Sequence, residues 1–152
     1  KDKYNELHPK ISPDGQWMAY ASDESGQNEV YVRPFPELDK MRRQVSTGGG
    51  DSPLWSRDGK ELFYRNDDAV MAVSVKTDPD FSLDVPKMLF QGSYVFLSDE
   101  GNEWDIHPDG KRFLMMKPSP STGAGPAAAA PRPKINIVVN WFEELKQRVP
   151  GK

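Results

Sequence analysis

The stretch Trp55–Tyr64, WSRDGKELFY, recurs in related form as ISPDGQWMAY at residues 11–20 and as IHPDGKRFLM at residues 106–115. Each copy starts with an apolar residue, continues through a polar stretch ending in Asp-Gly, and ends in an apolar-rich run. Measured between their aspartates, the copies lie 44 positions (14 to 58) and 51 positions (58 to 109) apart. A period near ~40–45 residues is typical of four-stranded propeller blades, so the repeat predicts blades of this kind.

The polar stretch in each copy has the composition of a type I turn. Such a turn favours Ser or Asp first, Pro second and Gly fourth, which is the order found at residues 12–15. The second copy has Arg57 at the second place, which this turn type tolerates. The repeated aspartates are therefore interpreted as turn residues rather than catalytic acids: they are Asp14, Asp58 and Asp109.

Segments rich in Val, Ile, Tyr and Phe surround every turn, as half-buried strands require. The predicted strands are 8–11, 16–22, 29–35 and 42–47 in the first unit, 52–55, 60–65, 69–75 and 86–92 in the second, and 103–106, 111–116 and 134–141 in the third. The fold class is predicted to be all-β, with three four-stranded antiparallel propeller blades that form a partial or half propeller and a short C-terminal helix. The third unit shows no fourth strand of its own.

One domain is expected over residues 1–152, and its blades follow the repeat. Blade one is predicted at about 8–47, blade two at about 51–92 and blade three at about 102–140. Residues 118–133, PSPSTGAGPAAAAPRP, are predicted to be a disordered insert in blade three, because proline on both sides of the Ala run prevents a stable helix.

A Gly-rich segment between the first two units needs its own interpretation. Residues 46–53, STGGGDSP, look like a phosphate-cradling loop, but the Lys-Ser/Thr of a P-loop is missing and no helix pattern follows. A crossover between blades is the preferred interpretation.

Residues 141–148 form an apolar stripe at helical spacing, with Asn140 and Glu143 spaced as a capping box variant. They predict the C-terminal helix.

The composition describes a soluble globular chain, since of 152 residues 36% are hydrophobic and 28% are charged, with a net charge of −3. This mild acidity argues against nucleic-acid binding, because phosphate binding needs clustered Lys and Arg. Without cysteine, disulfides and thiolate metal sites are excluded. The apolar runs are too short to cross a bilayer, so no membrane insertion is expected from this segment.

The repeats resemble the TolB-type, WD-like β-propeller repeat, whose signature is an inner strand, Ser-Pro-Asp-Gly and an apolar strand. This resemblance spans about residues 8–148. Four segments are also similar to the C-terminal propeller end of bacterial serine/threonine protein kinases: VYVRPFP, QVSTGGGDSPLWSRDGKELFY, HPDGKRFLM and INIVVNWFEELK. The resemblance implies a propeller with a sensing or binding role in an extracytoplasmic or periplasmic compartment.

Signatures of catalysis are missing from the sequence. It has no Gly-rich loop leading to Val-Ala-Ile-Lys, no His-Arg-Asp, no Asp-Phe-Gly and no Gly-x-Ser-x-Gly. We therefore expect a non-catalytic binding or sensing module that forms the C-terminal part of a larger signalling protein, such as a receptor-like serine/threonine kinase. The alternative is an accessory propeller of a prolyl-oligopeptidase-type serine peptidase or of another TolB-like enzyme.

Candidate ligand-binding residues follow from equivalent positions on the inner strands, which line the channel of a propeller. They are Lys10, Leu54 and Asp105, with Trp104 as a further candidate at the channel rim. Trp55 is instead predicted to pack between neighbouring sheets, because Ile11 and Ile106 stand at the same place in the other units.

No catalytic residue, cofactor or metal site is predicted. The two histidines, His8 and His107, lie at a strand start and in a repeated turn, and two His without Cys make a poor zinc set. Acidic pairs at 67–68, 78 and 80, and 99–100 fall at expected hairpin tips and lack EF-hand spacing, which leaves Ca²⁺ binding open.

Three blades are too few for a closed ring. Propellers close with ~4–8 blades, since each sheet buries both faces against its neighbours. The sequence therefore predicts either that the missing blades belong to a larger parent chain, or that two copies pair about a twofold axis into a homodimeric six-bladed ring. Residues 1–7, KDKYNEL, are a candidate for the missing outer strand of the third unit.

Overall fold

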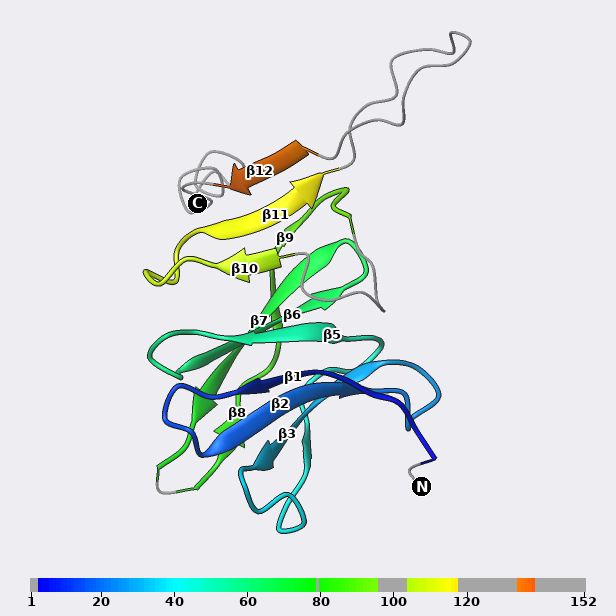
Figure 1. Ribbon diagram of the computed structural model, residues 1–152, viewed down its shortest axis with the longest axis vertical. Coiled ribbons are helices and arrows are strands. Elements are labelled where there is room, and N and C mark those ends of the chain that lie inside the picture. The colour runs from blue at the N-terminus through cyan, green and yellow to red at the C-terminus, as the bar shows by residue number, and fades with distance from the viewer. Residues whose placement is uncertain (1–2, 79, 96–103, 118–133, 139–152) are drawn as a thin grey trace, which may run out of the picture. The chain divides into compact units, whose positions relative to one another are not determined.

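The computed structural model describes residues 3–78, 80–95, 104–117 and 134–138, and every regular element in these ranges is a β-strand (Figure 1). All strand pairs are antiparallel. The prediction of an all-β fold is confirmed. In the described part of the chain, no helix is long and apolar enough to span a membrane.

The chain divides into two compact units. The first unit, Lys1–Gly92 with Leu97–Asn102, contains the first two sheets. The second unit, Ser93–Phe96 with Glu103–Lys152, contains the third sheet. The predicted single domain of three blades stays a prediction.

The first sheet has four strands in chain order, as predicted for the first unit. The strands are β1 (Glu6–Ile11), β2 (Trp17–Ser22), β3 (Glu29–Pro34) and β4 (Arg43–Gln44). Glu6 and Leu7 already belong to the inner strand, where they pair with Ser22 and Ala21. The hypothesis that residues 1–7 supply an outer strand to the third unit is therefore wrong for these two residues.

The second sheet has five strands rather than the four predicted. The strands are β5 (Asp51–Trp55), β6 (Glu61–Asn66), β7 (Ala69–Lys76), β8 (Ser82–Leu83) and β9 (Lys87–Gln91). β7 is long enough to take two short partners along one edge: β9 pairs with its first half and β8 with its last two residues, Val75 and Lys76. The additional strand exists because β7 extends past the end of β9.

The third sheet, in the second unit, has three strands within the described residues. They are β10 (Trp104–Ile106), β11 (Phe113–Lys117) and β12 (Lys134–Val138), in chain order. The predicted insert at 118–133 and the predicted helix at 141–148 lie outside the described residues.

The repeated hairpin has the same register in all three sheets. Ile11 pairs with Met18, Trp55 with Leu62 and Ile106 with Phe113. The alignment made on the Asp-Gly turns therefore matches the pairing of the strands.

Hydrogen bonds within each turn confirm that the repeated aspartates are turn residues. In the second sheet Ser56 Oγ donates to Asp58 Oδ1 at 2.7 Å and accepts from Glu61 N at 2.9 Å. The first sheet repeats both bonds. In the third sheet His107 stands in place of the serine, and its Nδ1 lies 3.1 Å from Asp109 Oδ1 and 3.2 Å from the amide nitrogen of Asp109. Gly59 closes the turn at a φ of 70°, a backbone region that glycine enters without strain.

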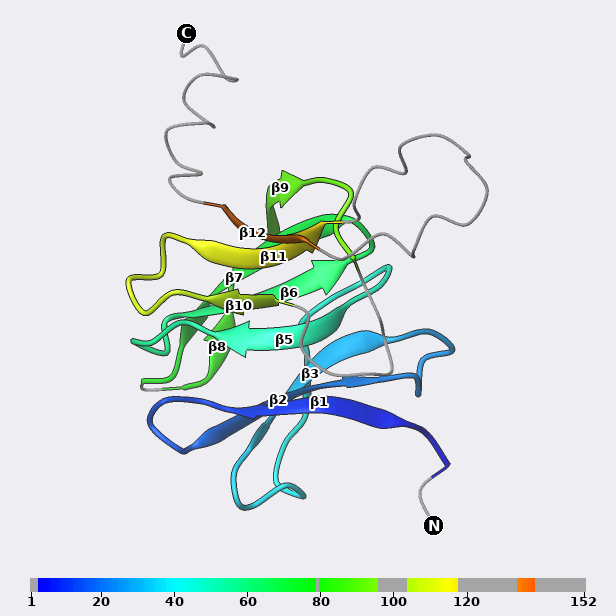
Figure 2. The ribbon, with the colours of Figure 1, turned by 45° about the horizontal axis from the view of Figure 1, so that its top comes forward.

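The first two sheets pack face to face within the first unit, where β1 and β5 lie side by side in both views (Figures 1 and 2). Small and β-branched residues of the first sheet meet aromatic, leucine and valine side chains of the second. The cluster consists of Ala19, Val30, Val32 and Val45 on one side and Trp55, Leu62, Tyr64, Val73 and Val75 on the other. Trp55 is 8% exposed and its Nε1 donates to Lys10 O at 3.0 Å. The prediction that Trp55 packs between sheets is confirmed.

Trp55→Ala is expected to lower the free energy of unfolding by about 3–5 kcal/mol, since it opens a cavity between the sheets and removes the bond to Lys10. Urea denaturation followed by circular dichroism measures this loss. Val85→Ala is the control: Val85 is 79% exposed, so its loss should stay within about 0.5 kcal/mol. Similar losses in both variants would contradict the role given to Trp55.

Candidate functional site

The predicted ligand-binding residues occupy matching positions on the inner strands. Lys10 pairs with Ala19 and is half-buried, whereas Leu54 pairs with Phe63 and is buried. β1 and β5 are adjacent in the first unit, so these two residues belong to neighbouring strands.

In the second unit, Trp104 and Asp105 are neighbours on β10. Asp105 is exposed and pairs with Leu114, at the same repeat position as Lys10 and Leu54. Trp104 is buried and stacks on Phe113 with ring centroids 6.0 Å apart. Asp105 therefore offers its side chain to solvent, whereas Trp104 contributes to packing.

A buried polar cluster joins the inner strands of the first two sheets. Asp51 Oδ1 accepts a hydrogen bond from His8 Nδ1 at 2.7 Å, and Asp51 Oδ2 accepts from Asn28 Nδ2 at 2.7 Å. The amide of Ser52 donates to Asp51 Oδ1 at 2.5 Å. All four residues converge from β1, the β2–β3 hairpin and β5, so one carboxylate ties three segments together.

His8 and Ser52 share an unusual backbone conformation. Their φ angles are 53° and 48°, in the left-handed region that residues with a Cβ rarely adopt. Each residue precedes a proline, and in both strands the register shifts here. This cluster was not predicted, although His8 and Ser52 stand at the same repeat position and each precedes a proline in the sequence.

The cluster contains Ser, His and Asp but not in the geometry of a catalytic triad. Ser52 Oγ lies 3.4 Å from His8 Nδ1, the same nitrogen that Asp51 holds. In a triad the aspartate and the serine use opposite ring nitrogens, so that the far nitrogen can take the serine proton. The arrangement therefore serves to hold the inner strands together.

A second buried carboxylate, Glu29, fills the Gly-rich loop that resembles a phosphate cradle. Glu29 Oε1 accepts hydrogen bonds from the amides of Gly48 and Gly49 at 2.8 and 2.9 Å. Glu29 Oε2 accepts from Ser46 Oγ at 2.5 Å. Successive amides of this kind form an anion-binding concavity, and here the protein's own side chain occupies it. This agrees with the rejection of a phosphate site at residues 46–53.

The electrostatics of this loop favour an ionised Glu29. Burial alone would raise the pKa of its carboxyl, but hydrogen bonds from Ser46, Gly49, Gln27 and Gly48 outweigh burial and lower the pKa below its ordinary value of 4.5. Gly50 next to them has no room for a side chain, since a Cβ there would lie 2.3 Å from Ser46 Oγ. The loop is thus shaped around an internal anion.

A hollow of about 310 Å³ lies between the hairpin corners of the first two sheets. Its apolar wall includes Trp17 and Trp55, and its rim carries Asp14, Asp58 and Lys60. Oδ1 of each aspartate accepts hydrogen bonds within its own turn, from a serine hydroxyl and from the backbone amide two residues on. Hydrogen bonds from Ser56 and the amide of Lys60 lower the pKa of Asp58. An aromatic wall with charged groups at its rim suits a small polar ligand.

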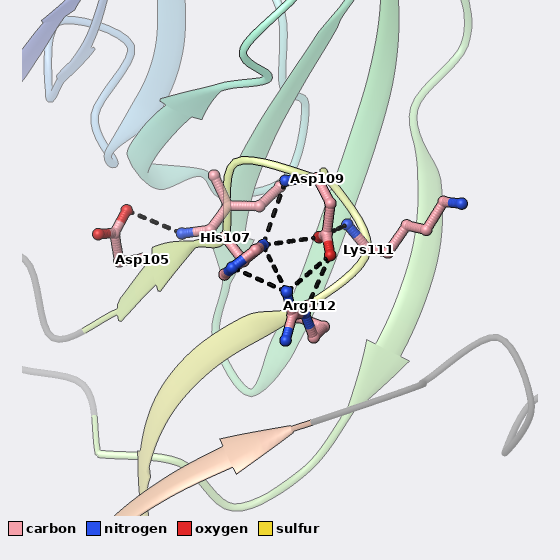
Figure 3. A network of polar contacts seen from close by, with 6 residues as sticks. Asp105, His107, Asp109, Lys111 and Arg112 are labelled. Carbon is pink, nitrogen blue, oxygen red and sulfur yellow. Dashed lines mark hydrogen bonds and ion pairs between the residues drawn. The ribbon is translucent and has the colours of Figure 1, made fainter.

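The corner of the third sheet carries a network of exposed polar side chains (Figure 3). Arg112 Nε donates to Asp109 Oδ2 at 3.0 Å, and the guanidinium lies 2.7 Å from His107 Nε2. The amide of Lys111 donates to Asp109 Oδ1 at 2.9 Å and is the leading cause of the lowered pKa of Asp109. Among the described residues, no three His, Cys, Asp or Glu side chains gather as a metal site.

Comparisons with known proteins bear on the fold. No family model matches the chain, and no curated protein matches its sequence. A TolB candidate from Agrobacterium tumefaciens is similar in structure at 14% identity and a TM-score of 0.56, over 90% of this chain and 48% of that one. A candidate 6-phosphogluconolactonase from Bacteroides uniformis is similar at 18% identity and a TM-score of 0.51, over 91% and 45%. An oligogalacturonate lyase from Vibrio parahaemolyticus has 17% identity and a TM-score of 0.48, over 74% and 28%.

The likenesses to the first two of these structures concern the fold alone, because both identities are below 25%. The fold is that of a TolB-like β-propeller, in agreement with the resemblance of the repeats. The chain spans less than half the length of each of these three structures.

Glu29→Gln is expected to lower the free energy of unfolding at pH 7 by about 1.5–3 kcal/mol, as is typical of hydrogen bonds to a charged group. A carboxyl with a depressed pKa contributes stability above its unfolded value of 4.5 and loses it as the pH falls through the folded pKa. The difference between wild type and variant should therefore shrink below pH 4.5. Urea denaturation at pH 7 and pH 3 measures it.

Glu37→Gln is the matched control, because Glu37 is exposed and forms a surface ion pair with Lys40. Its effect should stay below about 1 kcal/mol at both pH values. A pH-independent loss in Glu29→Gln would contradict the ionised state of Glu29 in the folded protein.

Proposed function

We propose that this chain is a non-catalytic binding or sensing module whose three sheets are blades of a partial β-propeller. We further propose that it forms the C-terminal part of a larger signalling protein, such as a receptor-like serine/threonine kinase. The single observation that carries the proposal is the hairpin register shared by all three sheets, in a chain with the TolB-like fold. The kinase link rests on the resemblance of the four sequence segments alone.

The polar groups of the first unit support a binding role rather than catalysis. Asp51 and Glu29 are buried and engaged in hydrogen bonds that tie strands and loops together. Asp14 and Asp58 each hold a turn, yet both also border the hollow between the hairpin corners. In this proposal the sheets form a rigid scaffold, and the ligand contacts the loops and the inner-strand ends.

Ser52 is the sharpest test of the non-catalytic part of the proposal. A fluorophosphonate probe labels serines activated by a histidine base. We expect no labelling of this chain at pH 7.5, because Ser52 Oγ lies beside the histidine nitrogen that Asp51 already holds. Intact-protein mass spectrometry measures the adduct. A label that disappears in Ser52→Ala and persists in Ser56→Ala would contradict the proposal.

The larger protein is tested by the open reading frame that encodes these residues. We expect a kinase domain with a Gly-rich loop, His-Arg-Asp and Asp-Phe-Gly on the N-terminal side, followed by a membrane-spanning segment. A hydrolase domain with a Ser-His-Asp set on the C-terminal side would contradict the kinase parent and favour an accessory propeller of a serine peptidase.

A further inference from the structure

The hairpin corners of the first two sheets lie next to each other, on the same side of the first unit in both views (Figures 1 and 2). A Cβ added to Gly59 in the second corner would lie 3.8 Å from Pro13 Cδ in the first, which is ordinary van der Waals contact. Gly59 also lines the hollow of about 310 Å³ described above, which we call the corner hollow. Its lining comes from these two corners and from the end of β7 with the residues that follow it, all within the first unit.

Two indole rings supply the apolar wall of the corner hollow, and neighbouring groups hold both of them. The Nε1 of Trp55 donates to Lys10 O at 3.0 Å. The ring of Trp17 packs on that of Phe81, with centroids 4.2 Å apart. Trp17 lies on the same face of β2 as Ala19, because side chains alternate along a strand, and this face packs on the second sheet. The wall is therefore already formed in the chain alone.

Two aspartates at equivalent positions of the repeat stand at the rim of the corner hollow. The amide of Gln16 donates to Asp14 Oδ1 at 3.0 Å, and the amide of Lys60 donates to Asp58 Oδ1 at 3.1 Å. A serine hydroxyl of the same turn donates to each of these oxygens as well. Both carboxylates are thus oriented by their turns, and binding a ligand to groups that are already ordered costs less conformational entropy.

Lysines share the rim with the aspartates, so charges of both signs surround the hollow. The lysines are Lys60 and Lys76, and the acids are Asp14, Asp58 and Asp78. All five side chains belong to exposed residues. Within the described part of the chain, no ion pair joins these lysines to these aspartates. The hollow therefore offers hydrogen-bond acceptors and hydrogen-bond donors to the same ligand.

This mixture of charges disfavours a ligand that carries a single charge. An anion in the hollow would be repelled by the aspartates, and a cation would be repelled by the lysines. A hydroxyl group donates one hydrogen bond and also accepts, so it suits carboxylates and ammonium groups equally. A neutral ligand with several hydroxyl groups matches the rim best.

The indole wall and the volume narrow the ligand further. An indole ring offers a large apolar surface with an electron-rich face, which the C–H groups of a sugar ring can cover while the hydroxyl groups project from the edge of the ring. The volume of about 310 Å³ lies at the lower end of the ~300–1,000 Å³ of small-molecule sites. The ligand is therefore small.

We propose that the corner hollow binds a neutral sugar. The C–H face of the sugar ring lies against Trp17 and Trp55. Its hydroxyl groups donate to the carboxylates of Asp14 and Asp58 and accept from the lysines of the rim. The inference rests on the proposed binding module and names the chemical class of its ligand.

Nuclear magnetic resonance of the full chain tests the place of binding. The probes are methyl glucoside, methyl galactoside and methyl mannoside, titrated into ¹⁵N-labelled protein. The indole N–H signals of Trp17 and Trp55 should shift with at least one of them. The signal of Trp104 should stay, because Trp104 is buried against Phe113 in the second unit. A folded chain in which no methyl glycoside shifts the Trp17 and Trp55 signals would overturn the proposal.

Asp58→Asn tests the role of the rim carboxylates. The variant removes the charge and keeps an oxygen that can accept the turn hydrogen bonds of Asp58. It should weaken binding of the sugar found in the titration by about 10-fold, as expected for a lost hydrogen bond to a charged group. Asp109→Asn is the matched control, since it makes the same change at the same repeat position in the second unit. Equal affinities of wild type and Asp58→Asn would overturn the proposal.

Lys76→Gln is a second variant that does not depend on a turn. Lys76 is an exposed residue at the end of β7, so the fold should tolerate the change. Binding should weaken by about 3-fold, the effect of one ordinary hydrogen bond. Lys87→Gln, an exposed residue of β9 outside the hollow, should bind as wild type does. Circular dichroism and urea denaturation show whether each variant is folded. Unchanged binding in a folded Lys76→Gln would overturn the role of the lysines.

Charged sugars test the class of ligand. Glucuronate adds a carboxylate to the glucose ring, and glucosamine adds an ammonium group. Both should bind more weakly than methyl glucoside, and the affinity for methyl glucoside should change little with salt, which screens charges. Equal or tighter binding of either charged sugar would overturn the neutral class. A folded chain that binds none of these sugars would overturn the inference and leave the binding module standing, since the fluorophosphonate and reading-frame tests address that module separately.

Discussion

Each sheet of this repeat has apolar side chains on both faces, and the need to cover both faces governs the rest of the molecule. In the first unit the need is met by a size match, in which Ala19, Val30 and Val32 leave room for Trp55 and Tyr64. Because the hairpin register is the same in each of the three sheets, the repeated turn places equivalent side chains on equivalent faces of each sheet. The Asp-Gly corners therefore specify contacts far from the corners themselves.

Two buried carboxylates secure the joints between these sheets. Asp51 connects the inner strand of the second sheet to His8 in the first, across 43 positions of the chain. Glu29 holds the Gly-rich crossover that links the two sheets. Buried charges are tolerated only where hydrogen bonds surround them, and both sites meet that condition. Apolar packing has no preferred direction. The hydrogen bonds of these polar groups are directional, and they therefore fix how the first two sheets are oriented.

Local chemistry allowed much of the fold to be predicted. Turn composition and alternation identified the hairpins and placed Ile11, Trp55 and Ile106 in one repeat position, which the strand pairing matches. Two features escaped because they depend on residues distant in sequence: the His8–Asp51 contact and the filling of the loop by Glu29. The short strand β8 escaped for another reason, since its two residues, Ser82 and Leu83, carry little strand signal of their own and pair only with the end of β7.

The candidate site residues illustrate the same limit. Lys10, Leu54 and Asp105 were correctly aligned as one repeat position, yet Leu54 is buried and Asp105 is exposed. The repeat determines the place of a residue on its strand, whereas the neighbouring sheet determines how exposed that residue is to solvent.

The Gly-rich crossover carries one more consequence. Because Glu29 is a permanent, covalently attached counter-anion for its amides, the geometry of this crossover is insulated from the sulfate, phosphate or chloride of the surrounding medium.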